Sequence, residues 1–262
     1  MASYSRRMCS ALALLTLLAQ AALGSVVLDA GHTPAGPGAR SAAGRAEVGY
    51  NDALATALAG HLRALGLRVI LTREPGAEVT PAERLSRARR ARPALVLSLH
   101  HDSVQPHFLE ARSAHPTCRR FRGFSLFVAW QGARPQVSLR LARRLSAALA
   151  TDGRTPTEHH AMPVSGERRP WLDRPAGVHE GSYIRLVREL AREDVPVVLL
   201  EAGVLVHPDE ERELADPARV ESMAAALARA VRAHLEAEAA LRQFFSLPAP
   251  RGLAPWAGIP AP

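Results

Sequence analysis

Histidine and glutamate side chains close three apolar stretches of the sequence, and these residue types hold catalytic metals and move protons. Leu95–Ser103 reads LVLSLHHDS, so a run of branched apolar residues ends on two histidines and an aspartate. Val26–His32 (VVLDAGH) and Val195–Gly203 (VPVVLLEAG) end in the same way. Short apolar runs of this kind are typical of buried parallel strands, whose carboxyl ends meet at one edge of an α/β sheet. The sequence therefore predicts one shared site at the ends of three strands.

A metal-binding set can be assembled from these strand ends. Catalytic zinc needs three protein ligands and an open position for water, and His32, Glu47 and His100 can supply such a set above one sheet edge. Glu201 ends another strand at that edge and is a candidate base for the attacking water. Residue chemistry alone leaves simpler roles open, because a histidine at a strand end is more often structural and Glu47 would suit a helix N-terminus. It also leaves open whether His100 or His101 is the ligand.

The composition limits the class of protein. The chain has 262 residues, of which 47% are hydrophobic, enough for one α/β domain with a real core. All 33 basic residues are arginine and the formal net charge is +8, which favours an anionic partner such as nucleic acid, a membrane surface or an acidic polymer. Aromatic residues are only 5% and do not interleave with a dense basic block, so we expect no nucleic-acid binding.

The N-terminus resembles a secretory signal peptide. Two arginines precede the apolar stretch Ala11–Leu23, which is short for a membrane span. Ala22-Leu23-Gly24 has the small–x–small pattern of a cleavage site before Ser25. We therefore predict a signal peptide at residues 1–24, a mature chain without a membrane span, and export to the periplasm, with an extracellular location as the alternative. Cleavage would remove Cys9 and leave Cys118 alone, which excludes an internal disulfide.

The periodicity predicts a single α/β domain at residues 25–240: an open, mixed but mostly parallel sheet of about six strands with helices on both faces. A Pro-rich tail at residues 241–262 is expected to be disordered. Gly66 is expected to end the first helix, and Thr80 and Pro81 to begin the second. The expected strands are Ser25–Ala30, Leu67–Leu71, Ala94–His100, Phe124–Ala129, Tyr183–Val187 and Val195–Leu200. The expected helices are Glu47–Leu65, Pro81–Arg92, Val137–Ala150 and Pro217–Glu238.

The segment Thr151–Ser182 lacks a helical or strand period and is rich in Pro, Gly and Arg. Long unpatterned loops of this type are usually either functional or mobile. Its histidines, His159, His160 and His179, are expected to be solvated loop residues, with contact to the substrate as the alternative.

Four motifs, taken together, carry a family resemblance across nearly the whole mature chain, from Val26 to Leu235. They read LDAGHTPAGPGARSAAGRAE, LTR, LVLSLHHDS and VPVVLLEAGVLVHPDEE. In this respect the chain resembles the zinc-dependent N-acetylmuramoyl-L-alanine amidases, the family that includes bacterial cell-division and sporulation amidases. His32 and Glu47 have the spacing of that family's first two zinc ligands, and the third motif assigns the remaining ligand to His100. The fourth motif places the catalytic glutamate at Glu201.

The resemblance implies a peptidoglycan hydrolase with one zinc ion per chain. It would cut the amide bond between the lactyl group of N-acetylmuramic acid and L-alanine of the stem peptide, with Glu201 as general base. Peptidoglycan is the implied partner, and we expect a monomer. A zinc peptidase acting on the stem peptide and a non-catalytic wall-binding protein remain alternatives. The chain departs from the family at Ala94, His101 and His207, where Asp, a small or apolar residue and Asn are usual.

Overall fold

The strands with the most continuous apolar sequences lie at the centre of a seven-stranded sheet. In this computed structural model, which describes residues 23–110, 115–164 and 168–246, β1 (Ser25–Ala30), β3 (Leu95–Asp102) and β7 (Val197–Val204) run parallel and side by side. The other strands are β2 (Arg68–Leu71), β4 (Ser125–Val128), β5 (Trp171–Asp173) and β6 (Val178–Glu180). The strand order is β2-β1-β3-β7-β4-β6-β5, and the pairs β4–β7 and β5–β6 are antiparallel. The carboxyl ends of β1, β3 and β7 therefore meet at one edge, as the sequence predicted.

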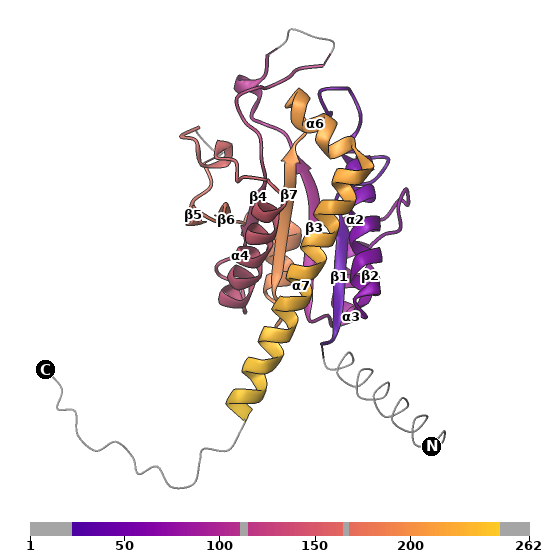
Figure 1. The fold of residues 1–262 in the computed structure, drawn as a ribbon, viewed down its shortest axis with the longest axis vertical. Coiled ribbons are helices and arrows are strands. Elements are labelled where there is room, and N and C mark those ends of the chain that lie inside the picture. Colours follow the sequence, from indigo (N-terminus) through magenta and orange to yellow (C-terminus); the bar gives the residue numbers. More distant parts are fainter. Residues whose placement is uncertain (1–22, 111–114, 165–167, 247–262) are drawn as a thin grey trace, which may run out of the picture.

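Helices cover both faces of this sheet (Figure 1). Residues of one strand alternate between the faces. Val26 and Leu28 belong to an apolar cluster with residues of α2 (Glu47–Ala64), α4 (Pro135–Thr151) and α7 (Pro217–Ser246), whereas Val27 belongs to a second cluster with residues of α3 (Pro81–Ala91) and α5 (Arg185–Ala191). In Figure 1 the long helix α7 crosses in front of the sheet between α2 and α4. The remaining elements are η1 (Pro106–Phe108), η2 (His159–Ala161) and α6 (Pro208–Ala215).

The predicted fold class is confirmed: an open, mixed, mostly parallel sheet with helices on both faces. Two helix boundaries are confirmed as well. Thr80 caps α3 by accepting the Glu83 N–H in a capping box, with Pro81 as the first helical residue, and Gly66 follows α2 with a φ of +81°. The local sequence is sufficient at these positions because capping side chains and left-handed glycines act over a few residues.

The prediction of a strand at Tyr183–Val187 is wrong. The segment from Arg185 onward is the helix α5, which buries Val187, Leu190 and Ala191 with helical spacing. Two short strands, β5 and β6, arise instead from Thr151–Ser182, which was expected to be loop. Three-residue strands carry too few residues for a period to be read, so the pairing of β6 with β4 and of β5 with β6 is set by the tertiary fold.

The termini are partly outside the described residues. The predicted signal peptide lies almost wholly in residues 1–22, which are outside the described range. Most of the predicted tail, residues 247–262, is also outside it. The helix α7 continues to Ser246 and so includes the first residues that were assigned to the tail. Among the described helices, none combines the length and apolar character needed to cross a membrane. Cys118 is a buried free thiol.

Candidate active site

Three side chains from separate elements converge at the carboxyl edge of the sheet. His32 lies in the loop after β1, Glu47 is the first residue of α2, and His100 lies near the end of β3. Oε2 of Glu47 is 3.1 Å from Nε2 of His32, and Oε1 is 3.2 Å from Nδ1 of His100. One donor atom from each residue lies within 4.8 Å of the others. The fold thus brings together the set proposed from the sequence.

Two glycines, which have no side chain, make room for the His32–Glu47–His100 set. A Cβ atom at Gly31 would lie 2.3 Å from Cε1 of His100, and one at Gly38 would lie 2.3 Å from Oε2 of Glu47. Gly38 also has a φ of +77°, a conformation that side-chain-bearing residues rarely adopt. A side chain at either position would push the imidazole or the carboxylate out of place.

Arg73 holds the loop that carries His32. His32 itself has a φ of +63°, which is uncommon for a residue other than glycine. The buried guanidinium of Arg73 donates from Nε to the His32 carbonyl at 2.7 Å and from Nη2 to the Gly31 carbonyl at 3.1 Å. Nη2 also pairs with Asp52 on α2 at 2.5 Å. Arg73 belongs to the LTR motif, from which no role could be inferred, and the structure shows that it binds the backbone carbonyls of His32 and Gly31.

Hydrogen-bond donors from three directions hold the Glu47 carboxylate. Ala39 N donates to Oε2 at 3.0 Å, while Asn51 Nδ2 and His101 N donate to Oε1 at 3.0 and 3.2 Å. Burial would raise the pKa of Glu47, but hydrogen bonds with the two histidines of the set oppose it, and the pKa is lowered. Glu47 is therefore an anionic carboxylate held in one orientation. Asn51, four residues along α2, is a supporting residue that the sequence reasoning missed.

His101 is directed to a different partner from its neighbour His100. Its Nδ1 lies 2.8 Å from Oδ1 of Asn51, and its ring is tilted against Tyr50. The side chain is buried, and this burial lowers the pKa of His101 to about 3, so the ring is neutral. The structure places His100, and not His101, with His32 and Glu47.

Glu201 stands beside this set. In the parallel register of β3 and β7, Glu201 is the partner of His100. The residue is partly exposed, yet its Oε2 atom is buried and has no hydrogen-bond partner. Burial, with smaller contributions from Asp102 and Glu47, raises the pKa of Glu201 well above its ordinary value. An unpartnered carboxylate oxygen that holds protons tightly is suited to accepting one from a substrate water.

The donor set fits a zinc ion. Two imidazole nitrogens and one carboxylate oxygen are donor types of three-ligand catalytic zinc sites. Two of the three side chains are held in place by other groups, as zinc ligands generally are: Arg73 holds the His32 loop, and Asn51 binds Glu47.

The expectation that His159, His160 and His179 are solvated is wrong. His159 and His179 are fully buried, and the side chain of His160 is 17% exposed. His159 and His160 both approach the carboxylate of Asp102, and His179 stacks between Trp171 and Phe127. These contacts join residues far apart in the chain, so the composition of the loop gave no sign of them.

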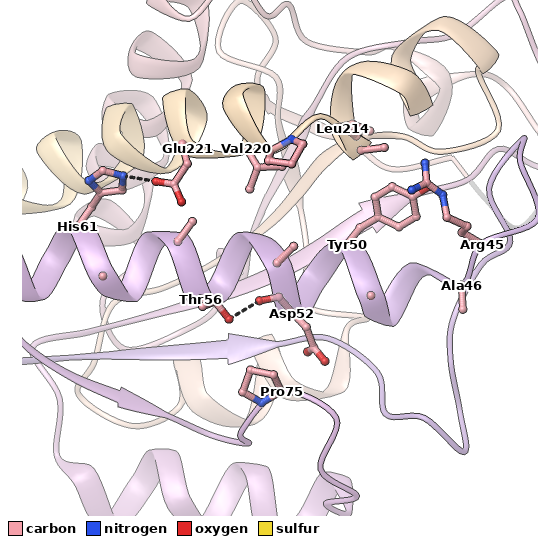
Figure 2. Close-up of a pocket in the computed structure, with 16 residues that line it drawn as sticks. Arg45, Ala46, Tyr50, Asp52, Thr56, His61, Pro75, Leu214, Val220 and Glu221 are labelled. Atoms are coloured by element: carbon pink, nitrogen blue, oxygen red, sulfur yellow. Dashed lines mark hydrogen bonds and ion pairs between the residues drawn. The ribbon is translucent and has the colours of Figure 1, made fainter.

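Two large cavities lie on opposite sides of α2 and β1. A groove of about 710 Å³ includes His32 and His100 in its wall and extends between α3 and α5 past Val79, Leu85 and Ile184. A second groove of about 800 Å³ lies between α2 and the helices α6 and α7 and contains none of the four candidate site residues. Figure 2 shows this second groove, with the ion pair between His61 and Glu221 closing one end. Of these two grooves, only the first includes residues of the candidate site.

Comparisons with known proteins agree with this geometry. A family model described as N-acetylmuramoyl-L-alanine amidase (Amidase_3) matches residues 26–233. A search of curated proteins gave no match.

Solved structures of similar fold include N-acetylmuramoyl-L-alanine amidase AmiC2 of Nostoc punctiforme, with 19% identity, a TM-score of 0.62, and 82% of this chain and 98% of that chain covered. Amidase Ami1 of Mycobacterium smegmatis has 21% identity, a TM-score of 0.62 and coverage of 81% and 96%. The catalytic domain of CwlV from Bacillus (Paenibacillus) polymyxa has 23% identity, a TM-score of 0.58 and coverage of 81% and 98%. At these identities the structures establish a shared fold.

Proposed function

Because the chain belongs to the N-acetylmuramoyl-L-alanine amidase family, we propose that it hydrolyses the amide bond between the lactyl group of N-acetylmuramic acid and L-alanine of the peptidoglycan stem peptide. The observation that carries this proposal is the convergence of His32, Glu47 and His100 beside the unpartnered Oε2 of Glu201. In this proposal the protein acts on peptidoglycan outside the cytoplasm, in the periplasm.

His32, Glu47 and His100 would hold a zinc ion. When bound, zinc polarises the scissile carbonyl and lowers the pKa of the attacking water. Glu201 accepts a proton from that water at Oε2 and returns it to the departing nitrogen of L-alanine, acting first as base and then as acid. The raised pKa of Glu201 supports the second half of this role, because the group must bind the proton long enough to deliver it.

The groove that includes His32 and His100 supports access for an extended substrate. Its wall combines apolar residues such as Leu85 and Leu186 with charged ones such as Glu78 and Arg185. A glycan carrying short peptides has both hydroxyl-rich and ionic groups, and a mixed wall suits it. A substrate bound in this groove would then reach His32 and His100 near the end of β3.

Glu201→Gln tests the role of Glu201. The variant should keep its zinc content and its thermal unfolding temperature but should hydrolyse purified sacculi about 10²- to 10⁴-fold more slowly, because it loses a proton carrier and no ligand. Glu236→Gln, the same change at an exposed position on α7, should behave as the wild type. If Glu201→Gln loses zinc instead, Glu201 is a ligand and another group must act as base.

A further inference from the structure

A second group of metal-ligating side chains lies beyond the end of β3. Nε2 of His160 is 2.6 Å from Oδ2 of Asp102, and Nε2 of His159 is 3.1 Å from the same oxygen. The two imidazole rings are 4.0 Å apart between centroids. One donor atom from each of the three residues lies within 4.8 Å of the others. None of these residues belongs to the His32–Glu47–His100 set.

One ring nitrogen of His159, Nε2, is buried and lacks a well-placed hydrogen-bond partner. Its Nδ1 lies 3.1 Å from the Thr157 hydroxyl, a contact that suits an Nδ1–H donating to Oγ1. In that tautomer Nε2 carries a lone pair and lies near the carboxylate oxygen of Asp102, which also carries lone pairs. The atom is buried and makes no hydrogen bond despite that short distance. In that tautomer a cation bound between the two atoms would offset the repulsion of their lone pairs, as a metal ion shared by two ligands does.

The surroundings hold the three side chains in place. A bulge between His100 and Asp102 re-aims the end of β3, and Oδ1 of Asp102 accepts the Ser103 N–H at 2.8 Å. The ring of Phe121 lies against His159, and that of Phe127 lies against His160. Such support from hydrogen bonds and packed rings is typical of metal ligands, which must be oriented before the ion binds.

A cavity of about 330 Å³ gives access to the group. His159 and His160 line it together with Gln105, Arg169 and Tyr183. Three protein ligands beside a cavity leave a further coordination position for water or for an oxygen of a small ligand.

We propose that Asp102, His159 and His160 form a second metal site, separate from the first, that binds a divalent first-row transition ion, with zinc as the expected occupant. Two imidazoles and one carboxylate favour zinc over magnesium or calcium, which prefer oxygen ligands alone. The site stands on its own geometry and does not depend on the proposed amidase activity.

Metal content per chain tests the proposal. The full mature chain, with any tag removed, is saturated with zinc, desalted and analysed by mass spectrometry for metals. The wild type should retain two zinc ions, and His160→Ala and Asp102→Asn one each. His32→Ala, which removes a ligand of the first site, should also retain one. His107→Ala removes an exposed imidazole next to the cavity but outside the group, and it should retain two.

Cobalt binding to His32→Ala gives a second readout that leaves the three proposed ligands intact. Titration with Co²⁺ should produce visible d–d absorption that saturates at one equivalent, and the same band should be absent in His32→Ala/His160→Ala. A wild type with one zinc ion that is lost in His32→Ala and kept in His160→Ala would overturn the proposal and leave the amidase site standing. A single zinc ion lost only in His160→Ala would uphold the second site and contradict zinc binding at the first.

Discussion

At the residue scale, the structure separates two adjacent histidines that the sequence could not separate by chemistry. His100 lies beside Glu47, and His101 turns to Asn51. The motif register favoured His100 as the ligand, and this arrangement is consistent with that prediction. The supporting residues Asn51 and Arg73 were not predicted, because a side chain that orients another through one hydrogen bond leaves no periodic or compositional sign.

His100→Ala and His101→Ala test this separation. His100→Ala should lower the zinc content by one equivalent per chain, because it removes a ligand, whereas His101→Ala should leave it unchanged. Metal analysis after desalting measures both, and circular dichroism verifies that the variants are folded. The opposite pattern would assign the ligand to His101.

At the element scale, the sequence predicted the strands that carry the site and missed much of what lies beside them. Continuous apolar runs defined the central strands, while β5, β6 and α5 are too short for their periods to be read. His207 illustrates a departure that the structure explains: its Nδ1 accepts the Glu210 N–H at 3.3 Å and so caps α6. An asparagine side chain can accept the same N–H, so the histidine preserves the cap.

A buried ion pair stabilises the strands behind the site. Asp29 on β1 is fully buried and accepts hydrogen bonds from Arg84 at 2.8 and 2.6 Å and from Ser98 at 2.7 Å. Burial tends to raise the pKa of Asp29, but the charge and hydrogen bonds of Arg84 oppose it, and the pKa is lowered from 3.8. The pair therefore connects α3 to the two strands that lead to His32 and His100.

Asp29→Asn should lower the free energy of unfolding by about 3–5 kcal/mol at neutral pH, because it leaves Arg84 buried without its counter-charge. The lowered pKa gives the sign of the pH dependence: the stabilisation by Asp29 is fully present above pH 3.8 and is lost as the pH falls through the native pKa. Urea unfolding at pH 7 and pH 3 should therefore show a smaller difference from wild type at pH 3. Asp194→Asn, in an exposed pair with Arg134, should change little, and equal losses in both variants would contradict the account.

At the scale of the whole molecule, the excess of arginine predicts a weak electrostatic attraction to anionic cell-wall polymer. The formal net charge of the full sequence is +8, or +6 without the predicted signal peptide and its Arg6 and Arg7, and the described residues form one α/β domain. Weak attraction to an anionic polymer is then the main contribution to non-specific binding, and salt screens it. The charge could be read from composition, whereas the burial of the histidines around Asp102 could not, because it depends on contacts between distant parts of the chain.

Binding of the Glu201→Gln chain to purified sacculi, measured by sedimentation, should weaken steadily as ionic strength rises, since the Debye length falls from about 10 Å at 0.1 M to about 3 Å at 1 M. The variant allows binding to be measured without hydrolysis. Binding that is unchanged in high salt would instead indicate a specific recognition surface.

The bond that the enzyme cuts is the most direct test of the central claim. Purified sacculi digested with the wild-type chain should release peptides whose new amino terminus is L-alanine, and should leave glycan strands whose muramic acid lactyl groups carry free carboxylates. Mass spectrometry of both fractions identifies these ends, and Glu201→Gln provides the background. Release of shorter peptides, with L-alanine still attached to the lactyl group, would show cleavage within the stem peptide and would contradict the assignment of this site as an N-acetylmuramoyl-L-alanine amidase.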